Sequence, residues 1–177
     1  DELDLRTVDV LAVLAQLVGY GALDRAWEAG ALVSTQGRYR FRHALVRQAL
    51  IEQIPPHRRV RMHRDIALRL AGTDTPPAQV AQHWLAAGQP ADAAPWLLAA
   101  ARDAVRLAAF SDALRHLAPL LAHEAEHAEA LRLRAEALDA MGDPGAMAAY
   151  HRAALAAGAP ASHNLRAKAA LAQVKQG

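Results

Sequence analysis

Residues 88–100, with the sequence GQPADAAPWLLAA, decide the fold that we expect for most of this chain. Gly88, Ala93, Leu97 and Ala100 follow one another at intervals of five, four and three residues. On a helix, small residues at 93 and 100 let a neighbouring helix approach closely, and Leu97 between them fills the groove. The stretch therefore predicts one helix of a tightly packed helix pair.

The same spacing returns twice further along the chain. The two later copies are Ala113-Leu117-Leu120 and Ala146-Tyr150-Ala153. They begin 33 residues apart, close to the roughly 34-residue period of tetratricopeptide repeats, whereas the first of them begins only 20 residues after Ala93. This part of the chain resembles a degenerate array of tetratricopeptide-like α-hairpins, and the short interval predicts one long shared helix from about residue 91 to 108.

The first third of the chain carries a different pattern. Apolar residues follow the helical period from about residue 7 to 18 and again from about 22 to 29, and Gly19-Tyr20-Gly21 is predicted to end the first of these helices. In Leu32–Thr35 and Arg38–Phe41 the period changes to two, and aromatic residues alternate with arginines around a Gln-Gly turn. This alternation predicts a β-hairpin with one apolar and one cationic face.

Two further helices are expected after this hairpin, from about residue 43 to 54 and from about 57 to 71. The second is predicted to turn Val60, Ala67 and Leu70 inward and most of its arginines outward. Helix, helix, hairpin and helix, in this order, is the element order of a winged-helix domain, with the hairpin as its wing.

The stretch Gly72–Pro77, rich in Gly, Thr and Pro, predicts a linker. We therefore expect a mainly α fold in two domains. A winged-helix domain with one small β-hairpin is expected at residues 1–72, and a domain of tetratricopeptide-like repeats at residues 73–177.

Composition excludes several classes of protein. The 45 alanines and 25 leucines, against eight aromatic residues in 177, are typical of packed helices and exclude an all-β fold. The chain has no Cys, which excludes disulfide scaffolds, thiolate zinc sites and Cys nucleophiles. No stretch approaches the length of a membrane-spanning helix, so we expect a cytoplasmic protein that makes no contact with a membrane.

The net charge of +2 conceals a strongly basic segment. Residues 38–69 hold nine arginines against Glu52 and Asp65, which gives a local charge of +7. A segment of this charge is suited to phosphate, to an acidic partner surface or to an acidic neighbouring domain. The arginines that we assign to this interdomain or phosphate-facing patch are Arg38, Arg40, Arg42, Arg47, Arg58, Arg59, Arg61 and Arg64.

Three stretches carry a resemblance to a known family. They are YRFRHALVRQAL at residues 39–50, PPHRRVRMH at residues 55–63 and AQHWLAAG at residues 81–88. Together with the helical repeats they make the chain similar to bacterial STAND-class signal-transducing ATPases, which include large transcriptional activators. In that family an ATPase core is followed by a winged-helix domain and then by helical repeats.

The resemblance implies a role in transcription regulation and signal transduction. It places His43 where the family has a winged-helix histidine that reaches the β-phosphate of bound ADP, although Arg42 and Ala44 flank it here instead of Met and Asp. The sequence contains no phosphate-binding Gly-rich loop, so ADP, ATP and Mg²⁺ are expected only with an ATPase core upstream of residue 1, and no cofactor is expected in this fragment. The implied partners are that ATPase domain, and a protein or small-molecule inducer that binds the repeats.

The sharpest motif match points to metal chemistry. His123, Glu124 and His127 satisfy the H-E-x-x-H pattern of zinc peptidases, in which two histidines on one helix face bind zinc and the Glu activates water. No convincing third ligand follows, and the stretch is predicted to open a repeat helix beside Leu120-Leu121. We therefore reject the zinc site and expect no catalytic residues and no enzymatic activity.

A DNA-binding winged helix with a helical dimerisation tail is the alternative hypothesis. The basic wing could hold a DNA backbone. However, the helix that would enter the groove, at about residues 22–29, holds Asp24 and Glu28 against the single basic residue Arg25. A recognition helix usually presents basic or amide side chains to the bases, so we expect contact with DNA only through other domains of the parent protein.

Overall fold

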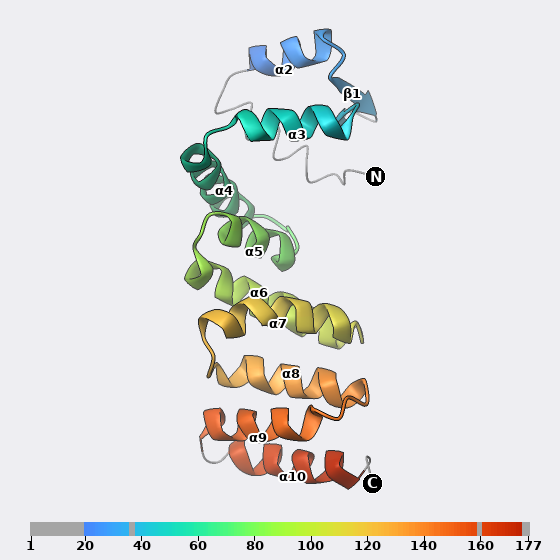
Figure 1. Cartoon of the computed structure of the whole chain (residues 1–177), viewed down its shortest axis with the longest axis vertical. Helices are drawn as coiled ribbons and strands as arrows, with labels where there is room; N and C mark the ends of the chain where they lie inside the picture. Colours follow the sequence, from blue (N-terminus) through green and yellow to red (C-terminus); the bar gives the residue numbers. More distant parts are fainter. Residues whose placement is uncertain (1–19, 36–37, 159–160, 175–177) are drawn as a thin grey trace. The chain divides into compact units, whose positions relative to one another are not determined.

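The computed structural model describes residues 20–35, 38–158 and 161–174, and the chain is mainly helical (Figure 1). It divides into two compact units, one ending at Ile66 and the other beginning at Ala67. The helix expected from about residue 7 to 18 lies outside the described residues. None of the described helices is both long and apolar enough to cross a membrane.

The N-terminal unit contains a helix, a two-stranded hairpin, a further helix and the first part of the next helix, which continues into the C-terminal unit. These elements are α2 (Tyr20–Glu28), β1 (Leu32–Thr35), β2 (Arg38–Phe41), α3 (Ala44–Gln53) and α4 (Pro56–Leu70). The strands pair antiparallel, with Leu32 opposite Phe41 and Thr35 opposite Arg38. The unit boundary falls inside α4, before the Gly72–Pro77 stretch where the sequence predicts the domain boundary.

Two details of α2 and α4 correct the sequence prediction. Tyr20 and Gly21 lie within α2, where the sequence predicts a break between two helices. Val60 is 46 % exposed, so its predicted inward position is wrong, whereas Ala67 and Leu70 are buried as predicted. Periodicity predicts which residues share an apolar helix face, but whether each of them is buried depends on which neighbouring elements pack against that face.

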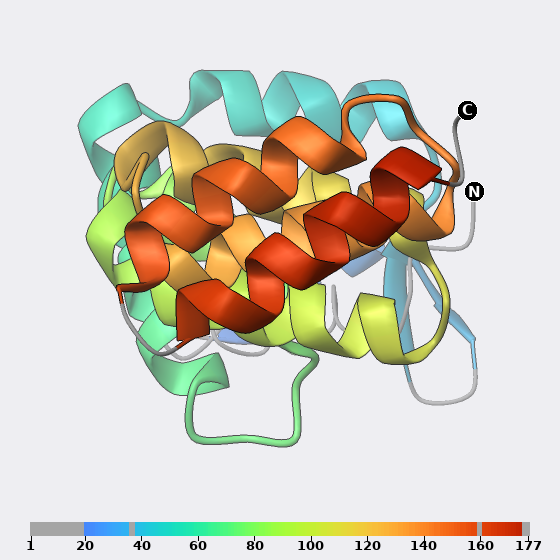
Figure 2. The same ribbon diagram turned by 90° about the horizontal axis from the view of Figure 1, so that it is seen from below.

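The C-terminal unit is a stack of helices, each packed on the next along the chain (Figure 1). They are α5 (Pro77–Ala86), α6 (Pro90–Arg106), α7 (Phe110–His123), α8 (Ala128–Ala140), α9 (Ala146–Ala157) and α10 (Ala161–Val174). The view from below shows α9 and α10 side by side (Figure 2). Helix α6 is the long helix expected at about residues 91–108, and it contacts α5, α7 and α8.

Alanine dominates the core of this unit. Every residue of the three spaced copies after Gly88 is buried, with Ala93, Ala113 and Ala153 fully inaccessible to solvent. Larger side chains fill the space between these contacts, led by Leu117, Leu120 and Tyr150. Because a methyl group projects so little, the helix backbones approach closely wherever two alanine faces meet.

Three turns between helices share one backbone conformation. The residue after the C-cap has a positive φ in each, +69° at Gly88, +56° at Ala108 and +70° at Gly142. The next N–H then bonds back into the helix, from Gln89 to Trp84, from Ala109 to Ala104 and from Asp143 to Leu138, at 2.8 to 3.0 Å. This is the Schellman arrangement, which satisfies the last carbonyl groups of a helix and reverses the chain.

Ala108 is strained in this turn. A left-handed conformation is free of steric cost for Gly but costs about 1 kcal/mol or more for a residue with a Cβ. Among the described residues, Ala108 is the one non-glycine residue with a positive φ. The packing of α6 against α7 therefore stabilises a turn that is itself strained.

We predict that Ala108→Gly raises the free energy of unfolding by about 0.5 to 1 kcal/mol, since relief of strain outweighs the added entropy of the unfolded chain. Gly142→Ala should lower it by about 1 kcal/mol, because an added Cβ meets no atom within 4 Å and only the backbone conformation is penalised. Urea denaturation measures both changes. Gly72→Ala is the control, because Gly72 has no positive φ, and equal effects at 72 and 142 would contradict the assignment.

Candidate functional site

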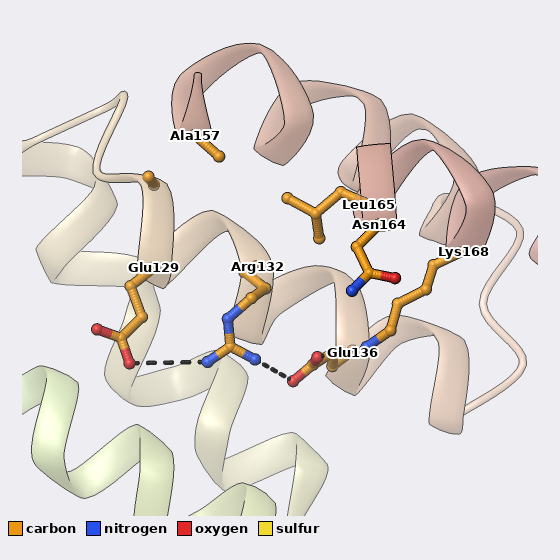
Figure 3. A pocket seen from close by; sticks show the side chains of 8 residues that line it. Glu129, Arg132, Glu136, Ala157, Asn164, Leu165 and Lys168 are labelled. Carbon is orange, nitrogen blue, oxygen red and sulfur yellow. Dashed lines mark hydrogen bonds and ion pairs between the residues drawn. The ribbon is translucent and has the colours of Figure 1, made fainter. Parts of the chain in front are cut away.

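Five charged side chains form a continuous row across α6, α8 and α10. Arg102 on α6 donates two hydrogen bonds to Glu129 on α8, at 2.8 Å from Nε and 2.7 Å from Nη2. Arg132 lies 3.6 Å from Glu129 and donates to Glu136 at 2.8 Å (Figure 3). Lys168 on α10 donates to the other oxygen of Glu136 at 2.8 Å. We call these residues the ion-pair row.

Helical spacing explains the α8 part of the row. Glu129, Arg132 and Glu136 are three and four residues apart, so they share one face of the helix. The opposite side of α8 turns to the core, where Ala130, Leu131, Leu133, Ala135 and Ala137 are all buried. Arg102 lies 27 residues before its partner Glu129 in the sequence, and Lys168 lies 32 residues after its partner Glu136. Only the packing of the unit therefore brings Arg102 and Lys168 to this face.

A cavity of about 420 Å³ lies beside the row. It is lined by Ala128, Glu129, Arg132, Glu136, Ala157, Asn164, Leu165 and Lys168. Figure 3 shows the charged side chains of α8 facing Asn164, Leu165 and Lys168 of α10 across it. The buried Leu165 and the two alanines make part of the lining apolar, while the rest is charged or amide.

The charges of the row act on one another. The hydrogen bond from Arg102 lowers the pKa of the Glu129 carboxyl, and partial burial opposes this effect. Lys168 Nζ also lies 6.0 Å from the centre of the Tyr150 ring. Burial raises the pKa of Tyr150 to about 12, and the nearby carboxylates of Asp139 and Glu136 contribute. The row therefore favours the ionised form of the Glu129 carboxyl, whereas the phenol of Tyr150 loses its proton only at a higher pH than usual.

A second cavity, of about 430 Å³, has two of its polar lining residues, Asp143 and Arg152, engaged in hydrogen bonds within the protein. It is lined by Leu131, Arg134, Leu138, Asp143, Gly145, Ala148, Ala149 and Arg152. Arg152 donates to the Ala125 carbonyl at 2.9 Å and to Glu126 at 3.0 Å, and Asp143 accepts from the Gly145 N–H at 2.7 Å. These contacts order the loops before α8 and α9, so we assign this cavity a structural role.

The basic patch predicted from the sequence is described in part. Arg58, Arg61 and Arg64 of α4 are exposed and lie three residues apart, on one side of the helix. Arg61 is 4.0 Å from Asp65, whereas Arg58 and Arg64 have no hydrogen-bond or ion-pair partner among the described residues. We call Arg58, Arg61 and Arg64 the arginine stripe.

The other predicted residues of the N-terminal unit have varied settings. Arg59 is half-buried, and Arg42 and His43 are exposed just before α3. The side chains of Arg38, Arg40 and Arg47 lie outside the described part of the chain.

The H-E-x-x-H stretch does not open a helix, which corrects the sequence prediction. Helix α7 ends at His123 and α8 begins at Ala128, so the two histidines do not share a helical turn. His127 is the N-cap of α8, and its Nδ1 accepts a hydrogen bond of 3.3 Å from the Ala130 N–H. Within the described residues, no group of three or more His, Cys, Asp or Glu is placed to hold a metal ion.

The ion-pair row and the cavity beside it escaped the sequence prediction. The alternation of acid and base at 129, 132 and 136 was a local signal for one polar helix face. No local signal connects this face to Arg102, Asn164 or Lys168. No family model, curated protein or solved structure matches the chain.

We predict that the Glu129 contribution to stability disappears in acid. A carboxyl with a lowered pKa in the folded state stabilises the protein above the unfolded-state pKa of about 4.5, and this contribution is lost as the pH falls through the folded-state value. Glu129→Gln should therefore lower the free energy of unfolding by up to about 1 kcal/mol near pH 7 and by much less near pH 3. Urea denaturation at both pH values tests this. Glu124→Gln, at an exposed position where the side chain has no partner among the described residues, should have no effect at either pH.

Proposed function

We propose that this chain is a non-enzymatic regulatory fragment whose C-terminal unit binds a partner protein or inducer on the face of α6, α8 and α10. The observation that carries the proposal is the ion-pair row, which runs over these alternate helices and borders a cavity of about 420 Å³. The row leaves charged groups partly exposed and held in place by mutual contacts. Such a surface is suited to recognition, because its polar groups are already oriented before a ligand arrives.

The spacing of the turns supports a tetratricopeptide-like repeat in this unit. Ala108 and Gly142 occupy the same place in two identical turns and are 34 residues apart, which matches the period of such repeats. On this interpretation α6, α8 and α10 are corresponding helices of successive repeats. Stacked helix pairs of this kind form extended surfaces that bind other molecules.

The N-terminal unit supports the regulatory part of the proposal. The described order of one helix, a hairpin and a helix is compatible with the later part of a winged-helix domain, and the exposed arginine stripe fits the contact with an ATPase domain that the STAND-class resemblance implies. His43 stands exposed immediately before α3, where it is accessible to a phosphate of a nucleotide held by that domain.

Selection from a library of random peptides displayed on phage tests the interaction function. We expect enriched peptides whose binding slows amide exchange in α8 and α10. Arg132→Ala should weaken their binding, and Arg134→Ala should not, because both substitutions remove one positive charge from α8 but only Arg132 belongs to the row. Failure to enrich any peptide, or equal loss in both variants, would argue against this function.

A second candidate function, DNA binding by the N-terminal unit, is favoured by one observation. Arg58 and Arg64 have no partners among the described residues, and arginines are well suited to bidentate contact with phosphate. Against it, α2 carries acidic side chains at Asp24 and Glu28, both exposed. These would repel the DNA backbone from the helix that enters the groove of DNA in winged-helix proteins.

We predict that the chain binds a random-sequence DNA duplex only weakly and only at low salt. If the three arginines of the stripe neutralise three phosphates, affinity should fall about 40-fold between about 50 mM and about 200 mM salt. Fluorescence anisotropy at both salt concentrations measures this fall, and Arg61→Ala should reduce the salt dependence. Micromolar binding that persists at the higher salt would make DNA binding the leading function of this unit.

A further inference from the structure

The cavity beside the ion-pair row has more unused hydrogen-bond donors than acceptors. The Lys168 ammonium has three N–H donors and gives one to Glu136, and Arg132 has five in its guanidinium group. The Asn164 amide makes no hydrogen bond within the described part of the chain. On the acceptor side, Arg102 already occupies both oxygens of Glu129, and Glu136 receives one bond on each oxygen.

The ion-pair row as a whole carries a net charge of +1, because three cations, Arg102, Arg132 and Lys168, face two carboxylates, Glu129 and Glu136. Arg102 does not line the cavity, so the charges of the lining itself balance, and the excess of hydrogen-bond donors on Arg132, Asn164 and Lys168 is what favours an acceptor there. The side chains of Arg132 and Lys168 are 38 % and 47 % exposed, so both remain accessible from solvent. An added carboxylate would meet cations that are already in position and would complete the alternation of charge.

We propose that this cavity binds the carboxylate of a glutamate or aspartate side chain in an acidic peptide, through Arg132, Asn164 and Lys168. This inference rests on the proposed interaction function of the C-terminal unit and specifies the chemistry that it recognises. The apolar lining at Ala128, Ala157 and Leu165 receives the aliphatic part of the same residue or of its neighbour. A cavity of about 420 Å³ is large enough for one or two side chains but not for a folded element.

The open position of the cavity favours a side chain within a peptide as the source of the carboxylate. Its charged groups are between about one-fifth and one-half exposed, and the row continues past it to Arg102 on α6. A peptide that crosses this face can pair a second polar group with the remainder of the row. An isolated small acid would leave those contacts unused.

Nuclear magnetic resonance titration of the full chain tests the proposal. The first probe is the peptide acetyl-Ala-Glu-Leu-Ala-amide, the second has Gln in place of Glu, and the third has Gln together with a free C-terminal carboxylate. We expect the first probe to shift the side-chain signals of Arg132, Asn164 and Lys168 in a saturable manner. Affinity for the Gln amide should be about tenfold lower, which corresponds to about 1.4 kcal/mol.

Matched variants connect the binding to the cavity. Lys168→Ala should weaken binding of the Glu probe about tenfold, whereas Arg166→Ala should not change it, because both remove a positive charge from exposed sites on α10 but only Lys168 lines the cavity. The amide spectra of the two variants should match that of the parent chain outside the substituted positions, which shows that both are folded. Arg132→Lys keeps the charge and should bind less tightly than the parent, because the fork of donors is lost.

Three results would overturn the proposal: no saturable shift with the Glu probe, equal binding of the Glu and Gln amides, or stronger binding of the probe with a free C-terminus. Peptides from the phage selection separate this failure from failure of the proposed function. If such peptides bind the α6, α8 and α10 face but are indifferent to Glu→Gln replacement, the interaction function stands and the carboxylate site does not.

Discussion

The close approach of helices through alanine is the constraint on which the C-terminal unit depends. Ala93, Ala113, Ala135 and Ala153 are fully buried, and each leaves room for a neighbouring backbone. Alanine loses no side-chain entropy on folding, so many small contacts hold the helices together with little opposing cost. The same arrangement tolerates larger residues poorly, since an added methylene has no space to occupy. The strained turn at Ala108 follows from it, because the two flanking helices can pack only if the chain reverses within a few residues.

The ion-pair row is a consequence of this packing. Long side chains from α6 and α10 reach acidic side chains of α8 at 2.7 and 2.8 Å because the stacking of the helices brings these three helices to one face. Its charges are partly exposed, so each pair adds little stability. The ion pairs fix the positions of the side chains instead, because Glu129, Arg132 and Glu136 each contact two oppositely charged neighbours in the row. A ligand that binds there meets groups whose side-chain freedom is already reduced.

The two units differ in the kind of recognition that their charges allow. The arginine stripe carries charges that no described residue balances at Arg58 and Arg64, and such a surface attracts anions over a distance and loses that attraction in salt. The ion-pair row is nearly neutral, so its attraction acts at short range and depends on geometry. A chain that carries both has one surface suited to a charged partner domain and another suited to a specific ligand.

The sequence by itself determined the mainly helical fold, the three spaced copies of small residues and the long helix α6, because helical periodicity and alanine spacing are local properties. It also identified the strands of the hairpin through their alternation. It failed at Val60, at the start of α2 and at the H-E-x-x-H stretch, where neighbouring elements and a helix cap decided the outcome. Only the tertiary structure brought Arg102, Glu136 and Lys168 into one row, because partners 27 and 32 residues apart meet through the packing of whole helices, which no local pattern records.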